Sequence, residues 1–224
     1  IFASKIESIR SVLKMPWYKY MHVTSGQIAQ LFPLVEFLNT IDLDKQLIPS
    51  VRVGFKKYYG PSKGLRQSTF GEFIAADTYF GNFINTGDFL HLHKLIACLY
   101  RPKQANYSEV KNTAKWNGDI REEFNDNLIT SRAEGFAKSL PLSYKWAILY
   151  FYYGFRNKHV LSFKNIFSKP KKAEDRSGND YGWAGVQMNL SGKEFGDFDE
   201  VAKKNWYTLL VFMSKSIDDN WSKK

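Results

Sequence analysis

The stretch from residue 68 to residue 102 constrains the fold most strongly, because two helix-start signals and two apolar stripes follow one another there. Thr69 and Glu72 have the T-x-x-E spacing of a capping box. Asp88 can cap a second helix after the polar break at residues 85–88, and Pro102 ends that helix. The apolar side chains recur at three- and four-residue steps, as Phe70, Phe73, Ala76, Phe80 and Ile84 and then as Phe89, Leu92, Leu95, Ile96 and Leu99. This spacing predicts an antiparallel helical hairpin whose apolar faces share one core.

Similar stripes along the rest of the chain predict a mainly α-helical, multi-helix single domain that spans residues 1–224. The expected helical segments are 2–13, 24–38, 109–113, 119–124, 131–139, 142–153, 159–167, 183–190 and 206–217. At most a short β element is expected, near residues 51–56, where valines and a phenylalanine alternate with other residues. Residues 169–182 are rich in lysine, glycine and mixed charge, so we expect a mobile loop there, before a C-terminal helical pair.

The segment 142–153 is apolar almost all round, which is typical of a buried central helix. Its spacing places Trp146, Leu149, Tyr150 and Tyr153 on one face, and Ile148, Phe151 and Tyr152 broaden that face. The residues expected to be buried together are Phe73, Phe80, Leu92, Leu99, Trp146, Leu149, Trp206 and Leu210. The single cysteine, Cys98, cannot form an internal disulfide and is interpreted as a small core residue.

Positive charge is concentrated in two segments that contain no acidic residue. The chain has a net charge of +10, and residues 45–71 and 135–173 hold six and eight of its lysines and arginines. Such a concentration favours an anionic partner, which could be nucleic acid, an acidic protein surface or the interior of a DNA-filled assembly. The alternative is that these side chains only keep the protein soluble. The candidate contacts to an anionic partner are Arg52, Lys56, Lys57, Lys63, Arg66, Arg156, Lys158, Lys164, Lys169, Lys171 and Lys172.

The sequence contains no recognisable catalytic, phosphate-loop or zinc-ligand motif. His91 and His93 are two residues apart, a step that places them on different faces of a helix. The adjacent acidic residues are interpreted as solvated charge: they are Glu122 with Glu123, Glu174 with Asp175, and Asp218 with Asp219. We therefore expect no enzymatic activity, no cofactor and no metal. No apolar run approaches the roughly 20 residues that a membrane-spanning helix needs, so no membrane contact is expected.

Three stretches carry a resemblance to known proteins. They are the run from Ser68-Thr69-Phe70-Gly71-Glu72-Phe73 through Thr86-Gly87-Asp88 to Ala97-Cys98-Leu99-Tyr100-Arg101-Pro102, the segment 144–156, and Glu194-Phe195-Gly196-Asp197 before the last helix. These stretches, about half of the chain, resemble uncharacterised proteins from phages and prophages of Bacteroidota bacteria. No catalytic motif comes with this family. The resemblance implies a protein made for the virion or its assembly, located in the virion or in the host cytoplasm during assembly.

We therefore expect a non-enzymatic structural or assembly component of a bacteriophage virion, associated with the tail, neck or capsid and acting through protein–protein contacts. Its partners would be other virion proteins. An aromatic content of 17% favours exposed aromatic anchors, so a homo-oligomer or ring is expected. The alternative is a nucleic-acid-binding protein that uses the basic segments 45–71 and 135–173. The net charge alone already predicts some non-specific DNA contact.

Overall fold

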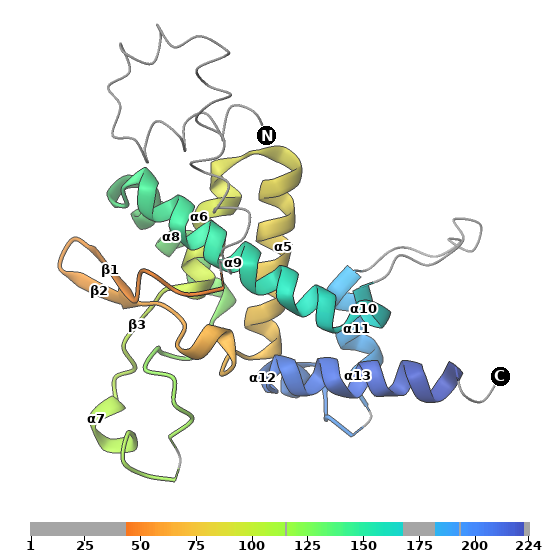
Figure 1. Cartoon of the computed structure of the whole chain (residues 1–224). Helices are drawn as coiled ribbons and strands as arrows, with labels where there is room; N and C mark the ends of the chain where they lie inside the picture. Colours follow the sequence, from red (N-terminus) through yellow and green to blue (C-terminus); the bar gives the residue numbers. More distant parts are fainter. Residues whose placement is uncertain (1–43, 115, 168–181, 193, 222–224) are drawn as a thin grey trace, which may run out of the picture. The chain divides into compact units, whose positions relative to one another are not determined.

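The computed structural model describes residues 44–114, 116–167, 182–192 and 194–221, all within one compact unit, Leu43–Lys224 (Figure 1). This unit is mainly α-helical and has one small antiparallel sheet, which confirms the predicted fold class. Its elements are β1 (Ser50–Val53), β2 (Lys56–Tyr59), the 3₁₀ turn η1 (Lys63–Leu65), α5 (Phe70–Thr86), α6 (Phe89–Leu99), β3 (Arg101–Pro102), α7 (Tyr107–Val110), the 3₁₀ turn η2 (Asp126–Leu128), α8 (Ile129–Ser139), α9 (Leu142–Ser162), α10 (Lys164–Phe167), α11 (Gly182–Leu190), α12 (Phe198–Lys203) and α13 (Trp206–Trp221). The predicted helices 2–13 and 24–38 lie outside the described residues, as does nearly all of the predicted loop 169–182.

Helices α5 and α6 form the predicted hairpin. Thr69 caps α5, because its side-chain oxygen accepts a hydrogen bond from the Glu72 backbone N–H. Gly87 ends the helix with a φ of 70°, a left-handed conformation that glycine adopts without strain. Asp88 then accepts a hydrogen bond from the Leu90 N–H and starts α6. The apolar stripe of α6 is sealed from solvent: Leu92, Leu95, Ile96, Ala97, Cys98 and Leu99 are each 0% exposed.

The sheet is a β-hairpin that is extended by a short third strand. β1 and β2 pair antiparallel, with Arg52 opposite Lys57, and β2 also pairs with β3. The chain reverses at Gly54 and Phe55, where Gly54 has a φ of 56°, as the first central position of a type II′ turn requires. The alternating pattern at residues 51–56 therefore covers the first strand and the turn, and a second strand follows it.

Helix α9 packs on α6 and buries only part of the predicted face. Its buried side chains are Lys145, Ile148, Leu149, Phe151, Tyr152 and Phe155. Tyr150 and Tyr153 are exposed, and Trp146 is only partly buried, against the rings of Phe83 and Phe89. The prediction is right for Leu149 and for the broadening residues Ile148, Phe151 and Tyr152, and it is wrong for Tyr150 and Tyr153. A helix that is apolar nearly all round has no single stripe to orient it.

The C-terminal helices dock on the start of α5. The Phe70 N–H donates to the Lys204 carbonyl at 2.8 Å, and Trp206 Nε1 donates to the Leu65 carbonyl at 2.7 Å. Trp206 is fully buried, and its ring stacks on Phe73 with 5.1 Å between the ring centroids. Trp206 thus joins the C-terminal helices to the same core as the α5–α6 hairpin.

The predicted core is confirmed except at Trp146. The buried cluster contains the other seven residues: Phe73, Phe80, Leu92, Leu99, Leu149, Trp206 and Leu210. Two outer members of the predicted stripes, Ile84 and Phe89, are exposed where α5 turns into α6. The stripes therefore cover the middle of the hairpin and leave its turn in solvent.

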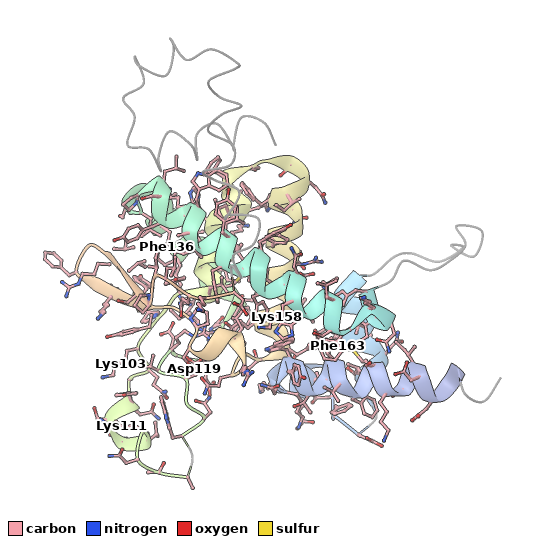
Figure 2. The ribbon with its side chains drawn as sticks, in the orientation of Figure 1. Lys103, Lys111, Asp119, Phe136, Lys158 and Phe163 are labelled. Carbon is pink, nitrogen blue, oxygen red and sulfur yellow. The ribbon has the colours of Figure 1, made fainter. Side chains whose placement is uncertain are left out.

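The chain makes a surface excursion between β3 and α8 that is closed at its base. Lys103 and Arg121 form an isolated antiparallel bridge where the chain leaves and returns. Figure 2 shows Lys103 and Lys111 on the excursion, and Asp119 where the chain comes back. The segment 119–124, predicted to be helical, is instead irregular, because its backbone pairs with the residues that follow α6.

Candidate functional site

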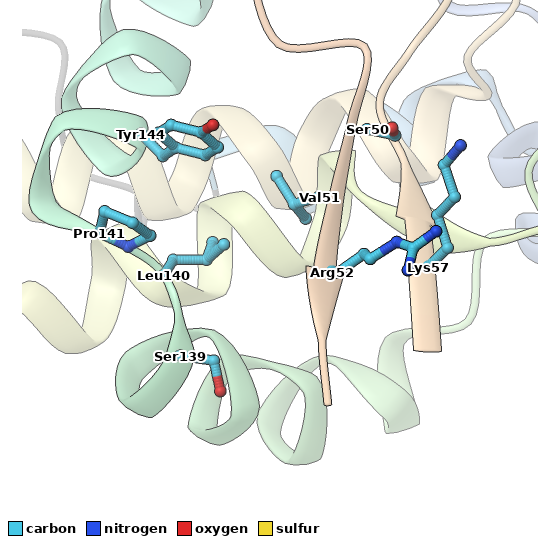
Figure 3. Close-up of a pocket in the computed structure, with 8 residues that line it drawn as sticks. All are labelled: Ser50, Val51, Arg52, Lys57, Ser139, Leu140, Pro141 and Tyr144. Carbon is cyan, nitrogen blue, oxygen red and sulfur yellow. The ribbon is translucent and has the colours of Figure 1, made fainter. Parts of the chain in front are cut away.

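A pocket of about 420 Å³ opens between the β1–β2 hairpin and the corner where α8 meets α9 (Figure 3). Its lining residues come from these two regions: they are Ser50, Val51, Arg52, Lys57, Ser139, Leu140, Pro141 and Tyr144. This lining combines two cations with hydroxyl groups and apolar surface, and none of the described residues adds a carboxylate, histidine or cysteine to it. The pocket can therefore bind an anionic group, and we take it as the candidate site.

The alternation of side chains along β1 and β2 places Arg52 and Lys57 together. The register sets these residues directly opposite each other, so both side chains leave the same face of the hairpin. Val51, one position earlier, points to the other face and is only 4% exposed. Figure 3 shows the Arg52 and Lys57 side chains next to each other, with Pro141 and Tyr144 on the opposite side of β1.

The charges of Arg52 and Lys57 take part in none of the ion pairs found in the described part of the chain. Both residues are exposed. The Lys57 Nζ lies 5.0 Å from the centroid of the Tyr59 ring, a cation–π contact that does not neutralise its charge. The pocket therefore presents a positive potential to an approaching group.

Phe55 lies at the tip of the same hairpin, and its side chain is fully exposed. Lys56 follows it in the chain and is also exposed, but its place opposite Val53 puts it on the other face from Lys57. The tip thus offers one aromatic ring with a cation on either face of the hairpin.

Two of the predicted anionic-partner contacts are paired with acidic residues inside the fold. The Arg156 Nε lies 2.5 Å from Asp77 Oδ1, and the Asp77 carboxylate also accepts a hydrogen bond from Trp183 Nε1. Lys158 pairs with Asp44. These ion pairs reduce the charge that Arg156 and Lys158 can offer to a partner.

The other predicted contacts are dispersed over the described surface. Arg66 is exposed between η1 and α5, and Lys164 is exposed on α10. Neither lines the pocket. The side chain of Lys63 and the whole of Lys169, Lys171 and Lys172 lie outside the described residues. Of the predicted contacts, Arg52 and Lys57 are the ones that the pocket brings together.

Sequence reasoning missed a buried cluster of four charges beneath the start of α5. Glu72 accepts hydrogen bonds from Arg101 Nη2 at 3.0 Å and from Arg121 Nη1 at 2.7 Å, and Asp119 accepts one from Arg121 Nη2 at 2.7 Å. None of the four side chains is more than 8% exposed. Because the Glu72 carboxylate is used here, the predicted capping box keeps only its Thr69 half.

The pKa values of the cluster follow from its pairing. Burial alone would raise the pKa of Asp119, but hydrogen bonds from Arg121 and its charge lower that pKa below the usual value. Burial would likewise lower the pKa of Arg121, but Glu72 and Asp119 raise it above the usual value. A sealed and paired cluster cannot reach a substrate, so we interpret it as structural. It fixes α5 to the chain on both sides of the excursion.

The histidines of the described residues and the cysteine do not line the pocket. His91 and His93 on α6 contact the rings of Tyr79 and Phe89. Cys98 is fully buried, and burial raises the pKa of its thiol well above the usual value, so its assignment as a core residue is confirmed. The described residues contain no group of three His, Cys, Asp or Glu side chains that could hold a metal ion.

None of the described helices combines the length and the hydropathy needed to cross a bilayer. No family model, curated protein or solved structure matches the chain. A function therefore has to be argued from the pocket, the hairpin and the exposed apolar side chains.

Proposed function

We propose that the protein is a non-enzymatic assembly component of a bacteriophage particle, which binds other particle proteins through its β1–β2 hairpin. The observation that carries this proposal is the fully exposed Phe55 ring at the tip of a hairpin whose Arg52, Lys56 and Lys57 are also exposed. Aromatic side chains that insert into a partner's pocket supply much of the binding energy of protein interfaces. The phage setting comes from the resemblance of residues 68–102 to phage and prophage proteins.

A second apolar surface also supports binding to protein. Helix α9 exposes Leu142, Tyr144, Tyr150, Tyr153 and Leu161, each between 39% and 65%. Tyrosine combines an apolar ring with a hydroxyl and is enriched at protein interfaces. Contact surfaces on both the hairpin and α9 would let one copy touch two neighbours, as a ring requires.

The chemistry of the pocket favours binding over bond-breaking. General acid–base or nucleophilic catalysis needs a titratable group held beside a reacting atom. The pocket lining offers an arginine, a lysine and hydroxyl groups, and the buried charges of Glu72 and Asp119 are sealed away from it. This arrangement suits recognition of a negatively charged partner.

The proposal is tested by inducing the phage or prophage that encodes the protein and measuring how much of the protein is bound to particles and assembly intermediates. The full-length protein is expected to co-purify with particle proteins. Phe55→Ala is expected to lower the bound fraction roughly tenfold or more, because an anchor ring dominates an interface. Met188→Ala is the control, because Met188 is also exposed but lies on α11. A strictly monomeric protein that is absent from particles and intermediates would overturn the proposal.

Nucleic-acid binding is the second candidate, and the pocket is the observation that favours it. Arg52 and Lys57 can contact phosphate beside the hydroxyl groups of Ser139 and Tyr144, and Phe55 can stack on a base. A backbone track, however, needs several cations in a row, and the other predicted contacts are dispersed or paired. DNA affinity near physiological salt separates the candidates. Tight binding that Arg52→Gln weakens would favour this second candidate.

A further inference from the structure

The outer edge of β1 carries backbone groups that take part in no hydrogen bond within the described part of the chain. β1 is the first strand in the sheet order β1-β2-β3, so only one of its edges is paired. The Gly60 N–H donates to the Pro49 carbonyl at 3.0 Å, and the same register puts the hydrogen-bonded pairs at the odd-numbered residues of β1. The N–H and C=O groups of Ser50 and Arg52 therefore point away from β2.

The pocket lies along this free edge. One wall is β1 and the other is the α8–α9 corner, with Leu140, Pro141 and Tyr144 (Figure 3). β1 has four residues and spans about 13 Å, so an extended segment of four residues would match its length. An edge with free backbone groups and a facing wall is the arrangement that strand addition uses.

We propose that an extended acidic segment of a partner particle protein adds to β1 as a further strand. The main-chain hydrogen bonds to Ser50 and Arg52 supply affinity, and the side-chain environment supplies specificity. The inference rests on the proposed function for the identity of the partner as a particle protein. It adds which strand is used and which kind of sequence binds there.

The two faces of β1 define the pattern of the partner sequence. Partner side chains opposite Ser50 and Arg52 share a face with Lys57, where Asp or Glu pairs with the two cations. Partner side chains opposite Val51 lie on the other face, toward the apolar wall that includes Leu140, where an apolar residue fits. The segment therefore alternates acidic and apolar residues.

The other occupants fit less well. A second copy of this chain brings a net charge of +10, and its own β1 would set another Arg52 against the pocket. Nucleic acid offers phosphates to the cations, but it has no regular row of N–H donors for the free carbonyl groups of β1. An acidic peptide satisfies both the charges and the strand edge.

The side-chain half of the inference is tested with a capped seven-residue peptide of alternating Glu and Val, titrated against the full chain near physiological salt. The peptide is expected to bind, and a peptide with Lys in place of Glu is not. Arg52→Gln and Lys57→Gln are each expected to weaken binding about threefold, the scale of one exposed charge pair. Lys215→Gln is the control, because Lys215 is also exposed but lies on α13, and it is expected to leave the affinity unchanged.

The backbone half is tested with N-methylated peptides on the unmodified protein. For an added strand that runs antiparallel to β1, methylation at the Glu positions removes the N–H groups that face β1 and is expected to abolish binding, whereas methylation at the Val positions is expected to preserve it. Ser50→Pro removes an outward N–H of β1 without removing a β1–β2 hydrogen bond. It is expected to weaken binding roughly tenfold, and the methylated peptides give an independent answer if this variant does not fold.

Absence of peptide binding, or an equal effect of the two methylation patterns, would overturn strand addition. Another outcome to check is displacement of the peptide by single-stranded oligothymidylate near physiological salt. If Arg52→Gln and Lys57→Gln also weaken the binding of that oligonucleotide, the site binds nucleic acid and strand addition is overturned. If Phe55→Ala loses particle association and Ser50→Pro keeps it, the proposed function stands and this inference is rejected. If neither variant loses association, both are rejected.

Discussion

Arg121 Nη1 lies 2.7 Å from Glu72 Oε1, although 49 residues separate them in the chain and neither side chain is more than 1% exposed. The same nitrogen donates to the Leu99 carbonyl at 2.7 Å. One guanidinium therefore joins the first turn of α5, the end of α6 and the returning end of the excursion. Charges buried this deeply are tolerated because they are paired: Glu72 also pairs with Arg101, and Arg121 also pairs with Asp119.

Glu72→Gln is expected to lower the free energy of unfolding by about 3–5 kcal/mol, because it leaves the two buried guanidinium groups of Arg101 and Arg121 with the single carboxylate of Asp119. Urea unfolding followed by circular dichroism measures this loss. Glu123→Gln is the control, because Glu123 is exposed, and it is expected to change the free energy by less than about 0.5 kcal/mol. A loss below about 1 kcal/mol for Glu72→Gln would contradict a stabilising pair.

Stability is expected to fall as the pH drops from about 6.5 to about 4, because of His159. Burial, followed by the charges of Lys158 and Arg66, lowers the pKa of His159 from 6.5 to about 4. Its ring centroid lies 4.6 Å from that of Phe155 and 4.8 Å from that of Trp206. The unfolded chain takes up this proton at a higher pH than the folded chain does. The stability that neutral His159 contributes is therefore fully present above its pKa in the unfolded chain. It is lost as the pH falls toward its pKa in the folded chain.

His159→Gln isolates this contribution, because glutamine does not titrate in the window. The melting temperature of the variant is expected to change less between pH 6.5 and pH 4 than that of the unmodified protein. These two pH values are the usual and the lowered pKa of His159. His91→Gln on α6 serves as a control histidine variant. Identical pH profiles for the unmodified protein and His159→Gln would refute this assignment.

Phe80→Ala and Phe55→Ala make the same chemical change at a buried and an exposed ring. Phe80 is 6% exposed and lies 5.4 Å from the Tyr152 ring, centroid to centroid, so its loss is expected to cost about 3–5 kcal/mol. Phe55 is fully exposed, so its loss is expected to cost less than about 0.5 kcal/mol. Thermal unfolding of both variants measures the difference. A destabilised Phe55→Ala would mean that the tip packs against something in the folded chain.

Gly81→Ala and Gly54→Ala are expected to have opposite effects on stability. Neither added methyl group meets an atom within 4 Å, so only the backbone conformation differs. Gly81 lies inside α5, where alanine is favoured by about 0.5–1 kcal/mol. Gly54 has a φ of 56°, which costs an L-residue about 1 kcal/mol or more. Melting temperatures should rise for Gly81→Ala and fall for Gly54→Ala, and shifts of the same sign would refute the argument.

Local patterns predicted the helical core well. The caps at Thr69 and Asp88 act within one helical turn, so the residues that make them are visible in the sequence. In α6 every predicted stripe residue except Phe89 is buried, so these core residues could be assigned from spacing alone. Helix α9 is the counterexample, because apolar side chains surround it and the spacing left Ile148 and Tyr150 equally plausible.

Long-range pairing was not visible in the sequence. Glu72 has the spacing of a capping residue, and only the return of the chain at residues 119–121 gives its carboxylate a stronger partner. The pocket depends in the same way on the α8–α9 corner approaching β1. Arg52 and Lys57 stood among the candidates because they are basic, but the register that pairs them required knowledge of the turn at Gly54.

The bridge between Lys103 and Arg121 makes the excursion a place where foreign sequence can be inserted. The chain leaves and re-enters the core at neighbouring points. For a loop anchored in this way, each doubling of its length raises the entropic cost of closing it by only about 0.6 kcal/mol. Asn112 is exposed within it. A fluorescent protein or an affinity peptide placed after Asn112 is expected to leave the melting temperature nearly unchanged. Such a fusion would let the hairpin and α9 surfaces be followed during particle assembly with both left unaltered.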